Sequence, residues 1–467
     1  MGKSLTAPQN TGATARQRCL QPSCGGIYAL ADRVYVCSRC GGPLEIDAPL
    51  GVATGDPAAL REKWRLRAAS PDAKNRSGVW RYREFLPLDP DAPVTLFEGN
   101  TPLYDAPRSA EYCGIDVLQL KHQGCNPTGS FKDTGMTVAV THAAMLGAKT
   151  TICASTGNTA ASLAAYSARA RFRCAILVPY GQISSAKLAQ SMDYGASIFE
   201  VEGNFDDCMR LVQELGGDPA IYVANSINPF RIEGQKTVVF ELMEQCGWRV
   251  PDAVVMPGGN LGNSSAFGKG FNELRDAGLI DRVPRLYVIQ AEGSAPFVRM
   301  FEELGPHPSG PEHNLPETMI AETHPYTLAT AIKIGAPVSW KKSLRAVLES
   351  RGEVIAATEQ EIADAKAIIG REGIGCEPAS ATTVAGIRRL AREGKIRCDE
   401  NVIAVLTGHL LKDPEYVSNY HRGTLALPAE PEGMRRERRI DGAFQNCPQR
   451  VAANKSAILK RLESREA

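Results

Sequence analysis

Residues 124–136 read Gly-Cys-Asn-Pro-Thr-Gly-Ser-Phe-Lys-Asp-Thr-Gly-Met. An Asn-Pro-Thr-Gly turn precedes Lys132, which Phe131 and Asp133 flank. Ser130 and Asp133 have the spacing of a capping box, with Asp in place of Glu, so we expect Lys132 in the first turn of a helix. Desolvation and the positive end of the helix dipole favour its neutral amine, the form that makes an imine with an aldehyde. Alone, the motif is better explained as a solvated lysine at a helix start.

A hydroxyl-rich loop follows next along the chain. Ser155, Thr156 and Thr159 lie between a β-like run at 150–153 and an alanine-rich helical run at 160–170. Hydroxyl groups and the backbone N–H groups of a helix start can together hold an anion such as a carboxylate. An ordinary cluster of N-cap residues is the simpler alternative.

Two further loops come directly after apolar runs. Gly258–Asn263 (GGNLGN) follows residues 253–257, and its glycines let the backbone approach phosphate oxygens, where successive N–H groups form a nest. Thr407 follows residues 402–406, at the strand end where open α/β sheets place ligand contacts. One kind of cofactor would use all four features, namely the reactive lysine, the hydroxyl loop that can hold an anion, the glycine loop that can hold a phosphate and the polar residue at a strand end. Such a cofactor has an aldehyde, a phosphate and a ring nitrogen. Pyridoxal 5'-phosphate has all three.

The chain also resembles a known family. Its motifs are similar to those of the threonine synthases, which belong to the fold-type II pyridoxal-phosphate enzymes. The matching stretches occur in family order between about residues 80 and 425: EGNTPL (98–103), NPTGSFKD (126–133), STGNTAAS (155–162), NSINPFRIEGQKT (225–237), GGNLGN (258–263), EPAS (377–380), and TGH with LKD (407–413). The commonest family pattern after the lysine has arginine where this chain has Thr134, and the plant-type branch also lacks that arginine.

The resemblance implies roles for individual residues. Lys132 would bind the cofactor covalently and move protons, Asn158 would hydrogen-bond its 3-hydroxyl, and Thr407 would meet the pyridine nitrogen. A hydroxyl there, unlike a carboxylate, is not expected to keep that nitrogen protonated. The other implied cofactor contacts are Phe131, Gly259, Asn260, Leu261, Gly262 and Asn263, the last five at the phosphate. The implied substrate contacts are Ser155, Thr156, Thr159, Ser226 and Arg231, the last two at the substrate's own phosphate.

The activity implied by the resemblance is conversion of O-phospho-L-homoserine and water to L-threonine and phosphate. Two alternatives stay open at this stage. Another fold-type II lyase or synthase, such as a threonine dehydratase, would keep Lys132 and the phosphate nest without needing Ser226 and Arg231. A catalytically retired pyridoxal-phosphate-binding protein would use its cysteine-rich segment as an interaction module.

Four of the thirteen cysteines form a spaced set. Cys19 and Cys24 are separated by four residues and Cys37 and Cys40 by two, and each pair is followed by Gly-Gly. We expect a short hairpin over residues 27–36 between them. Four thiolates presented in this way suit a closed tetrahedral Zn²⁺ site of structural type. Four free thiols in a degenerate ribbon are the alternative.

Composition and patterning predict the organisation. The chain has 467 residues, 43% of them hydrophobic, and a formal net charge of +1, which gives no electrostatic footprint for nucleic acid or a membrane. We expect a cytoplasmic protein, and the resemblance implies a homodimer. Apolar runs alternating with helical ones predict an α/β fold with parallel sheets, and the resemblance implies two doubly wound open-sheet domains like those of the tryptophan synthase β subunit. The predicted strands cover 117–121, 150–154, 174–179, 197–201, 221–224, 253–257, 285–290 and 402–406. The predicted parts are a tail with a zinc-ribbon-like β element (1–50), a connector (51–97), a large cofactor-binding domain (98–134 and 241–427), a small mobile domain (135–240) and a charged tail (428–467).

Overall fold

The computed structural model describes residues 15–21, 23–48, 56–181, 185–305, 316–429 and 437–463. Parts of the predicted N-terminal tail, connector and C-terminal tail, namely 1–14, 49–55, 430–436 and 464–467, lie outside the described residues. The chain divides into two compact units, Met1–Lys412 and Asp413–Ala467. Each is described by itself.

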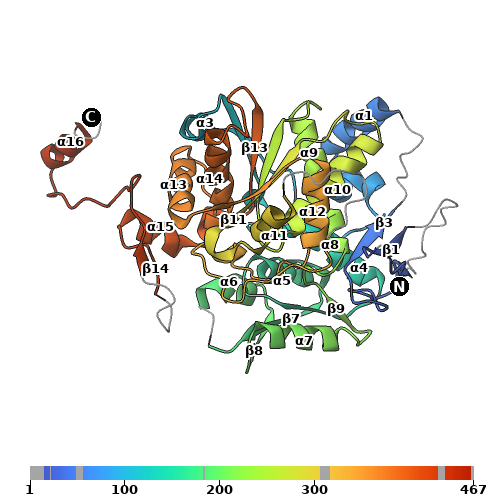
Figure 1. Ribbon diagram of the computed structural model, residues 1–467. Coiled ribbons are helices and arrows are strands. Elements are labelled where there is room, and N and C mark those ends of the chain that lie inside the picture. The colour runs from blue at the N-terminus through green and yellow to red at the C-terminus, as the bar shows by residue number, and fades with distance from the viewer. Residues whose placement is uncertain are drawn as a thin grey trace. The chain divides into compact units, whose positions relative to one another are not determined.

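The larger of the two α/β sheets in the first unit has six strands in the order β12-β11-β10-β13-β5-β4 (Figure 1). All neighbours pair in parallel except β4, which pairs antiparallel with β5 at one edge. The strands are β4 (Leu103–Asp105), β5 (Val117–His122), β10 (Ala253–Pro257), β11 (Arg285–Ala291), β12 (Val354–Ala357) and β13 (Asn401–Leu406). Every residue of β10 is buried, as expected for a central parallel strand with helices on both faces.

A second sheet has four strands, all parallel, in the order β8-β7-β6-β9. Its strands are β6 (Thr150–Ala154), β7 (Arg173–Pro179), β8 (Ser197–Val201) and β9 (Ile221–Val223). They fall within the range predicted for the small domain. The eight strands expected from the sequence are all present, and the structure adds β4 and β12.

Helices connect and cover these sheets. Along the chain, α1 (Pro57–Ala68), α2 (Ala73–Arg76) and η1 (Trp80–Phe85) lie between the ribbon and the large sheet, and α3 (Pro107–Cys113) connects β4 to β5. The small sheet is accompanied by α4 (Lys132–Met145), α5 (Asn158–Ala170), α6 (Ser185–Asp193), α7 (Phe205–Leu215) and α8 (Phe230–Gln235). Helix α9 (Thr237–Gln245) packs against the large sheet. The large sheet is accompanied by α10 (Gly262–Asp276), α11 (Pro296–Leu304), α12 (Trp340–Glu349), α13 (Glu359–Arg371) and α14 (Pro378–Arg392), with short 3-10 turns η2 (Gln123–Cys125), η3 (Glu292–Ser294), η4 (Thr330–Ile332) and η5 (Leu410–Lys412).

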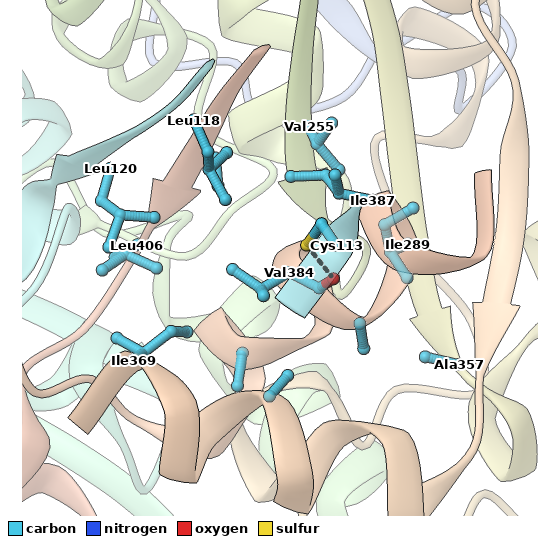
Figure 2. Close-up of a cluster of buried hydrophobic side chains, with 14 of the residues drawn as sticks. Cys113, Leu118, Leu120, Val255, Ile289, Ala357, Ile369, Val384, Ile387 and Leu406 are labelled. Carbon is cyan, nitrogen blue, oxygen red and sulfur yellow. Dashed lines mark hydrogen bonds between the residues drawn. The ribbon is translucent and has the colours of Figure 1, made fainter. Parts of the chain in front are cut away.

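The hydrophobic core of the large sheet lies between its strands and the helices α3, α13 and α14. Figure 2 shows Leu118, Val255 and Leu406 from three adjacent strands meeting Val384 and Ile387 of α14. Burying an aliphatic side chain of this kind stabilises the fold by about 1.5–3 kcal/mol. This packing holds the strand ends in fixed relative positions.

A three-stranded antiparallel sheet precedes both, in the order β2-β1-β3. Its strands are β1 (Arg16–Cys19), β2 (Ile27–Ala29) and β3 (Leu44–Asp47). The expected hairpin within residues 27–36 is wrong, because β2 pairs with β1 rather than with the residues that follow it. The cysteine knuckles thus sit at the ends of one small sheet, which we call the ribbon (residues 15–48).

The second unit contains α15 (Pro414–His421), an antiparallel pair of β14 (Ala426–Leu427) and β15 (Arg438–Arg439), and α16 (Lys455–Glu463). In the part of the chain that the structure describes, no helix is both long enough and apolar enough to cross a membrane.

Candidate active site and metal centre

Three neighbouring parallel strands end at one edge of the large sheet. Strand β13 lies between β10 and β5, and all three run in the same direction. Their carboxyl ends are followed by Thr407, by the glycine loop 258–263 and by the turn that carries Lys132. Crevices outside the carboxyl ends of such strands are where open α/β sheets bind ligands.

Lys132 is the first residue of α4, as expected, but the cap differs from the prediction. The N-cap is Phe131 and makes no side-chain cap hydrogen bond, so the predicted Ser130–Asp133 capping box is wrong. The Asp133 carboxylate instead accepts from the Thr128 backbone N–H at 2.7 Å and from the hydroxyls of Thr128 and Ser162, each at 2.6 Å. Asp133 therefore ties the lysine turn to α5 of the small sheet.

The Lys132 amine is buried beside an aromatic ring and has a lowered pKa. Its Nζ is 4.1 Å from the Phe131 ring centroid, and the Phe131 backbone N–H donates to the Thr407 carbonyl at 2.9 Å. Burial, and after it the Arg231 charge, lower the pKa of Lys132 to about 7, while the Glu377 charge opposes the shift. About half of the amine is neutral at pH 7, against about one in 3,000 for an ordinary lysine.

A buried carboxylate, Glu377, joins two of the predicted cofactor contacts. It accepts a hydrogen bond from Asn158 Nδ2 at 2.9 Å and one from Thr407 Oγ1 at 3.1 Å. Glu377 lies in the EPAS motif (377–380), and the resemblance to the family implied no role for it. The motif itself was the only available signal, because Asn158 is 219 positions away in the chain.

The glycine loop has the geometry of an anion nest. Leu261 is a buried non-glycine residue with a φ of 63°, a left-handed conformation that costs free energy and is concentrated at functional sites. It is the N-cap of α10, and no side chain caps that helix start. Asn263 is buried, and its Oδ1 has no hydrogen-bond partner within the described residues. Gly259 and Gly262 lie in the same loop, which leaves backbone N–H groups for a phosphate.

Asn260 links the loop to a predicted substrate contact. Its Nδ2 donates to Ser226 Oγ at 2.6 Å, and its Oδ1 accepts from the Val338 backbone N–H at 2.6 Å. The structure thus places Asn260 beside the residue expected at the substrate's phosphate.

The hydroxyl loop lies at the carboxyl end of β6. Ser155, Thr156 and Thr159 are half-buried, and α5 begins at Asn158. Gly157, the N-cap of α5, has no side chain to cap the helix start. The first N–H groups of this helix are therefore free of a side-chain acceptor, as an anion site requires.

Arg231 is a buried cation, only 2% exposed. Nη1 donates to the Ala224 carbonyl at 3.2 Å, and Nε has no hydrogen-bond partner within the described residues. No ion pair involving Arg231 is found there either. Desolvation lowers the pKa of Arg231 to about 10. A buried guanidinium without a counter-charge is costly, and an anionic ligand beside it would offset that cost.

These features fit pyridoxal phosphate. The nest and the uncapped start of α10 suit its phosphate, the Lys132 amine with its lowered pKa suits its aldehyde, and Asn158 and Thr407 supply polar contacts for its ring. The chemistry of each donor matches one group of the cofactor.

The four cysteines of the ribbon form a second site. All four sulfur atoms lie within 4.8 Å of one another, and the Cys19–Cys40 and Cys24–Cys37 pairs are each 3.5 Å apart. Tetrahedral Zn²⁺ with Zn–S bonds of about 2.3 Å has sulfur atoms about 3.8 Å apart. A side chain at Gly26 would place its Cβ 2.8 Å from Cys37 Sγ, which explains that glycine. The arrangement fits a closed structural zinc site.

The ribbon contacts both α/β sheets. On the small-sheet side, Tyr35 Oη accepts from the Val223 backbone N–H at 2.9 Å, and His142 of α4 donates to the Leu30 carbonyl at 2.9 Å. On the large-sheet side, Lys269 of α10 donates to the Ile46 carbonyl at 2.6 Å and Lys342 of α12 donates to the Leu44 carbonyl at 2.5 Å. The ribbon therefore contacts both the small-sheet part and the large-sheet part of the first unit.

Comparison with known proteins identifies the class. A family model described as pyridoxal-phosphate dependent enzyme matches residues 94–408, so the chain belongs to that class of enzymes. The threonine synthase of Methanocaldococcus jannaschii is 45% identical over 404 residues, covering 85% of this chain and 93% of that protein. The threonine synthase of Mycobacterium leprae is 46% identical over 337 residues, covering 72% and 88%. Within its class the chain belongs to the threonine synthase family.

Solved structures confirm the predicted fold class. The processed form of threonine deaminase isoform 2 from Solanum lycopersicum matches with a TM-score of 0.57 and 18% identity, covering 78% of this chain and 94% of that chain. The fungal L-serine ammonia-lyase from Rhizomucor miehei matches with a TM-score of 0.55 and 21% identity, covering 69% and 98%. At these identities the likeness shows the fold alone.

Proposed function

We propose that the protein converts O-phospho-L-homoserine and water to L-threonine and phosphate. The observation that carries this assignment is Arg231, a buried guanidinium with no acidic partner among the described residues, close enough to Lys132 to lower its pKa. A pyridoxal-phosphate enzyme whose substrate lacks a phosphate has no need for such a cation. The names of the relatives at 43–46% identity agree.

The same proposal assigns residues to the cofactor. Lys132 would bind it covalently, residues Gly259–Asn263 would hold its phosphate, Asn158 would contact its 3-oxygen and Thr407 its ring nitrogen, with Phe131 beside the lysine. When bound, the cofactor supplies a conjugated ring that accepts negative charge from the substrate carbons. Zn²⁺ on Cys19, Cys24, Cys37 and Cys40 has a structural role, because four protein ligands leave no open position.

Lys132 carries the proton transfers. Once the substrate's amino group replaces it, its amine takes the Cα proton, and a pKa near 7 suits such a base at neutral pH. A Cβ proton is then lost and phosphate leaves from Cγ. A proton added at Cγ, the hydroxyl group of water added at Cβ and a proton returned to Cα complete the replacement.

Two anion sites orient the substrate. Arg231 and Ser226 bind the phosphate, for which a planar guanidinium fork is well matched. Ser155, Thr156 and Thr159 at the start of α5 bind the carboxylate. Fixing both ends of the substrate places Cα beside Lys132, which contributes to catalysis by orientation.

We place the enzyme in the cytoplasm, because its thirteen cysteines, all within the described residues, form no disulfide, and disulfides are rare in cytosolic proteins. A homodimer is the family expectation, which light scattering of the purified protein tests.

Product analysis tests the proposed function. Phosphate release from O-phospho-L-homoserine and ammonia release from threonine are measured side by side on the purified enzyme. We expect phosphate release, with the activity abolished in Lys132→Ala. Ammonia release in place of phosphate release would establish a dehydratase, and absence of the cofactor's visible absorbance would establish a retired protein.

A further inference from the structure

Helix α8 carries a buried carboxylate that the proposed mechanism does not use. Glu233 is fully buried, and it forms ion pairs with Lys236 at 2.6 Å and with Lys269 of α10. Lys236 also donates to Glu273 of α10 at 2.8 Å. Burial acts to raise the pKa of Glu233, but the charges of Lys236 and Lys269 outweigh it and hold that pKa below its ordinary value. The Glu233 carboxylate is therefore ionised at neutral pH.

Glu233 lies two residues after Arg231 on the same helix. Successive residues of an α-helix are rotated by about 100°, so side chains at positions i and i+2 point to nearly opposite faces. The Arg231 guanidinium reaches the Ala224 carbonyl at 3.2 Å, and its charge lowers the pKa of Lys132. Glu233 instead faces Lys269 of α10. A rotation of α8 about its axis that moved Glu233 would therefore move the Arg231 guanidinium as well.

Helix α8 lies in close contact with the helix that begins at Lys132. A Cβ at Gly234 would lie 1.9 Å from the Thr134 carbonyl oxygen, so α8 and α4 meet backbone to backbone. The start of α10 is also near, since a Cβ at Gly262 would lie 3.7 Å from Ile232 Cδ1. No side chain projects from α8 at its glycine contact with α4. This contact sets the separation of the two helices and leaves their relative rotation to other contacts.

Lys269 joins α8 to the ribbon and to α10. Its ammonium group has three donor protons. It donates to the Ile46 carbonyl of the ribbon at 2.6 Å and pairs with Glu233, and Glu273 Oε1 of its own helix lies 3.7 Å from its Nζ. Burial acts to lower the pKa of Lys269, but the charges of Glu233 and Glu273 raise it overall, so the amine stays charged. Lys269 lies two turns after the glycine loop at which α10 begins.

We propose that Lys269 is a positioning residue for the substrate's phosphate. Its ion pair with Glu233 fixes the rotation of α8, and with it the place at which the Arg231 guanidinium meets that phosphate. The inference rests on the proposed function, which puts the substrate's phosphate at Arg231. Buried ion pairs often add little to stability, because desolvation offsets their attraction, and they can instead select one arrangement of the elements that they join. Because α10 begins at the glycine loop, the same pair sets the spacing between the two phosphate sites.

Phosphate binding to the cofactor-loaded enzyme tests this role, because the glycine loop is then already filled. Isothermal titration calorimetry measures the Kd of inorganic phosphate, and steady-state kinetics measure KM and kcat for O-phospho-L-homoserine. We expect Lys269→Met to raise both the Kd and KM by about 10- to 100-fold, the effect of a small displacement of a binding group, with a much smaller change in kcat. Lys269→Arg keeps the charge and should restore most of the affinity. The Kd of the cofactor itself should stay at the wild-type value in both variants.

Lys342→Met is the matched control. Lys342 of α12 donates to the Leu44 carbonyl of the same ribbon strand at 2.5 Å, whereas the ion pairs of Glu233 within the described residues are with Lys236 and Lys269. This variant should keep the wild-type phosphate Kd and KM. Equal weakening in Lys269→Met and Lys342→Met would show a general loosening of the ribbon and overturn the inference. A wild-type phosphate Kd in Lys269→Met overturns it as well.

A further variant keeps the test decisive if Lys269→Met does not fold. Lys269→Gln removes the charge and keeps an NH₂ group that can donate to the Ile46 carbonyl or to Glu233. It should also weaken phosphate binding, and a wild-type Kd in this variant overturns the inference. Phosphate release by the wild type reports separately on the proposed function. A wild type that neither binds phosphate nor releases it from the substrate refutes that function and the inference together, whereas an active wild type with an unchanged Kd in the Lys269 variants refutes the inference alone.

Discussion

Arg231→Met tests whether the buried guanidinium exists for the substrate's phosphate. Methionine has a similar length and no charge. Arg231 is 2% exposed, and within the described residues its guanidinium donates one hydrogen bond, to the Ala224 carbonyl, and has no acidic partner. The folded protein therefore desolvates a charge that these residues do not pair. Replacing a buried ion pair by apolar residues is often neutral or stabilising by about 1–4 kcal/mol, and an unpaired charge carries the same desolvation cost without the attraction of a partner. We expect the substrate-free variant to be at least as stable as the wild type, although most core substitutions destabilise.

Ligand binding should change in the opposite direction. Inorganic phosphate at about 100 times its Kd stabilises the wild type by about 2.7 kcal/mol, and the variant should lose this stabilisation. The assay is denaturant unfolding of the cofactor-loaded enzyme, whose glycine loop is already filled, with and without phosphate. Losing a charge-assisted contact costs about 2–5 kcal/mol, so kcat/KM for the phosphorylated substrate should fall by about 30- to 5,000-fold.

Arg173→Met provides the matched control, because Arg173 is an exposed arginine at the start of β7 in the same sheet. It should leave both the phosphate effect and kcat/KM unchanged. An Arg231→Met protein that is destabilised like an ordinary core variant and is still stabilised by phosphate would refute the reasoning.

Three other expectations follow from the site and the ribbon. The rate at which cofactor binds to the apoenzyme should rise about tenfold per pH unit up to about pH 7 and level off above it, because the neutral Lys132 amine is the nucleophile. Stopped-flow absorbance measures this rate. A rate that still rises at pH 9 would contradict the lowered pKa of Lys132. Asp133→Asn should lower the free energy of unfolding by about 1–3 kcal/mol and lower cofactor occupancy, because the new NH₂ group would face donors from Thr128 or Ser162. Denaturant titration measures the stability, with exposed Asp206→Asn as the control. Equal stability of the two variants would contradict the role of Asp133 in joining the lysine turn to α5. Chelation should release one Zn²⁺ per chain and lower the melting temperature, because the ribbon contacts both sheets. Metal analysis measures the zinc and thermal unfolding measures the melting temperature. The Cys40→Ser variant should show the same lower melting temperature as the chelated wild type.

Much of the fold could be predicted because buried parallel strands are continuous apolar runs. Strands β10 and β13 are examples, with β10 buried at every residue. The two strands that were missed lack this signal: β4 has three residues, none of them buried, and β12 is a four-residue strand at the opposite edge of the sheet. Local hydrogen bonding was predicted less well, since the Asp133 carboxylate accepts from Thr128 and Ser162 and does not form the expected capping box with Ser130.

The sequence by itself determined the chemistry of the site, because a lysine behind a tight turn, a glycine-rich phosphate loop and two cysteine pairs carry their functional groups within a few consecutive residues. Tertiary structure decided how those groups act on one another. Glu377 and Asn158 are 219 positions apart, and Arg231 has no acidic partner among the described residues that surround it. Hydrogen-bond direction and the pairing of buried charges depend on distances between elements that only the packed sheets and helices establish.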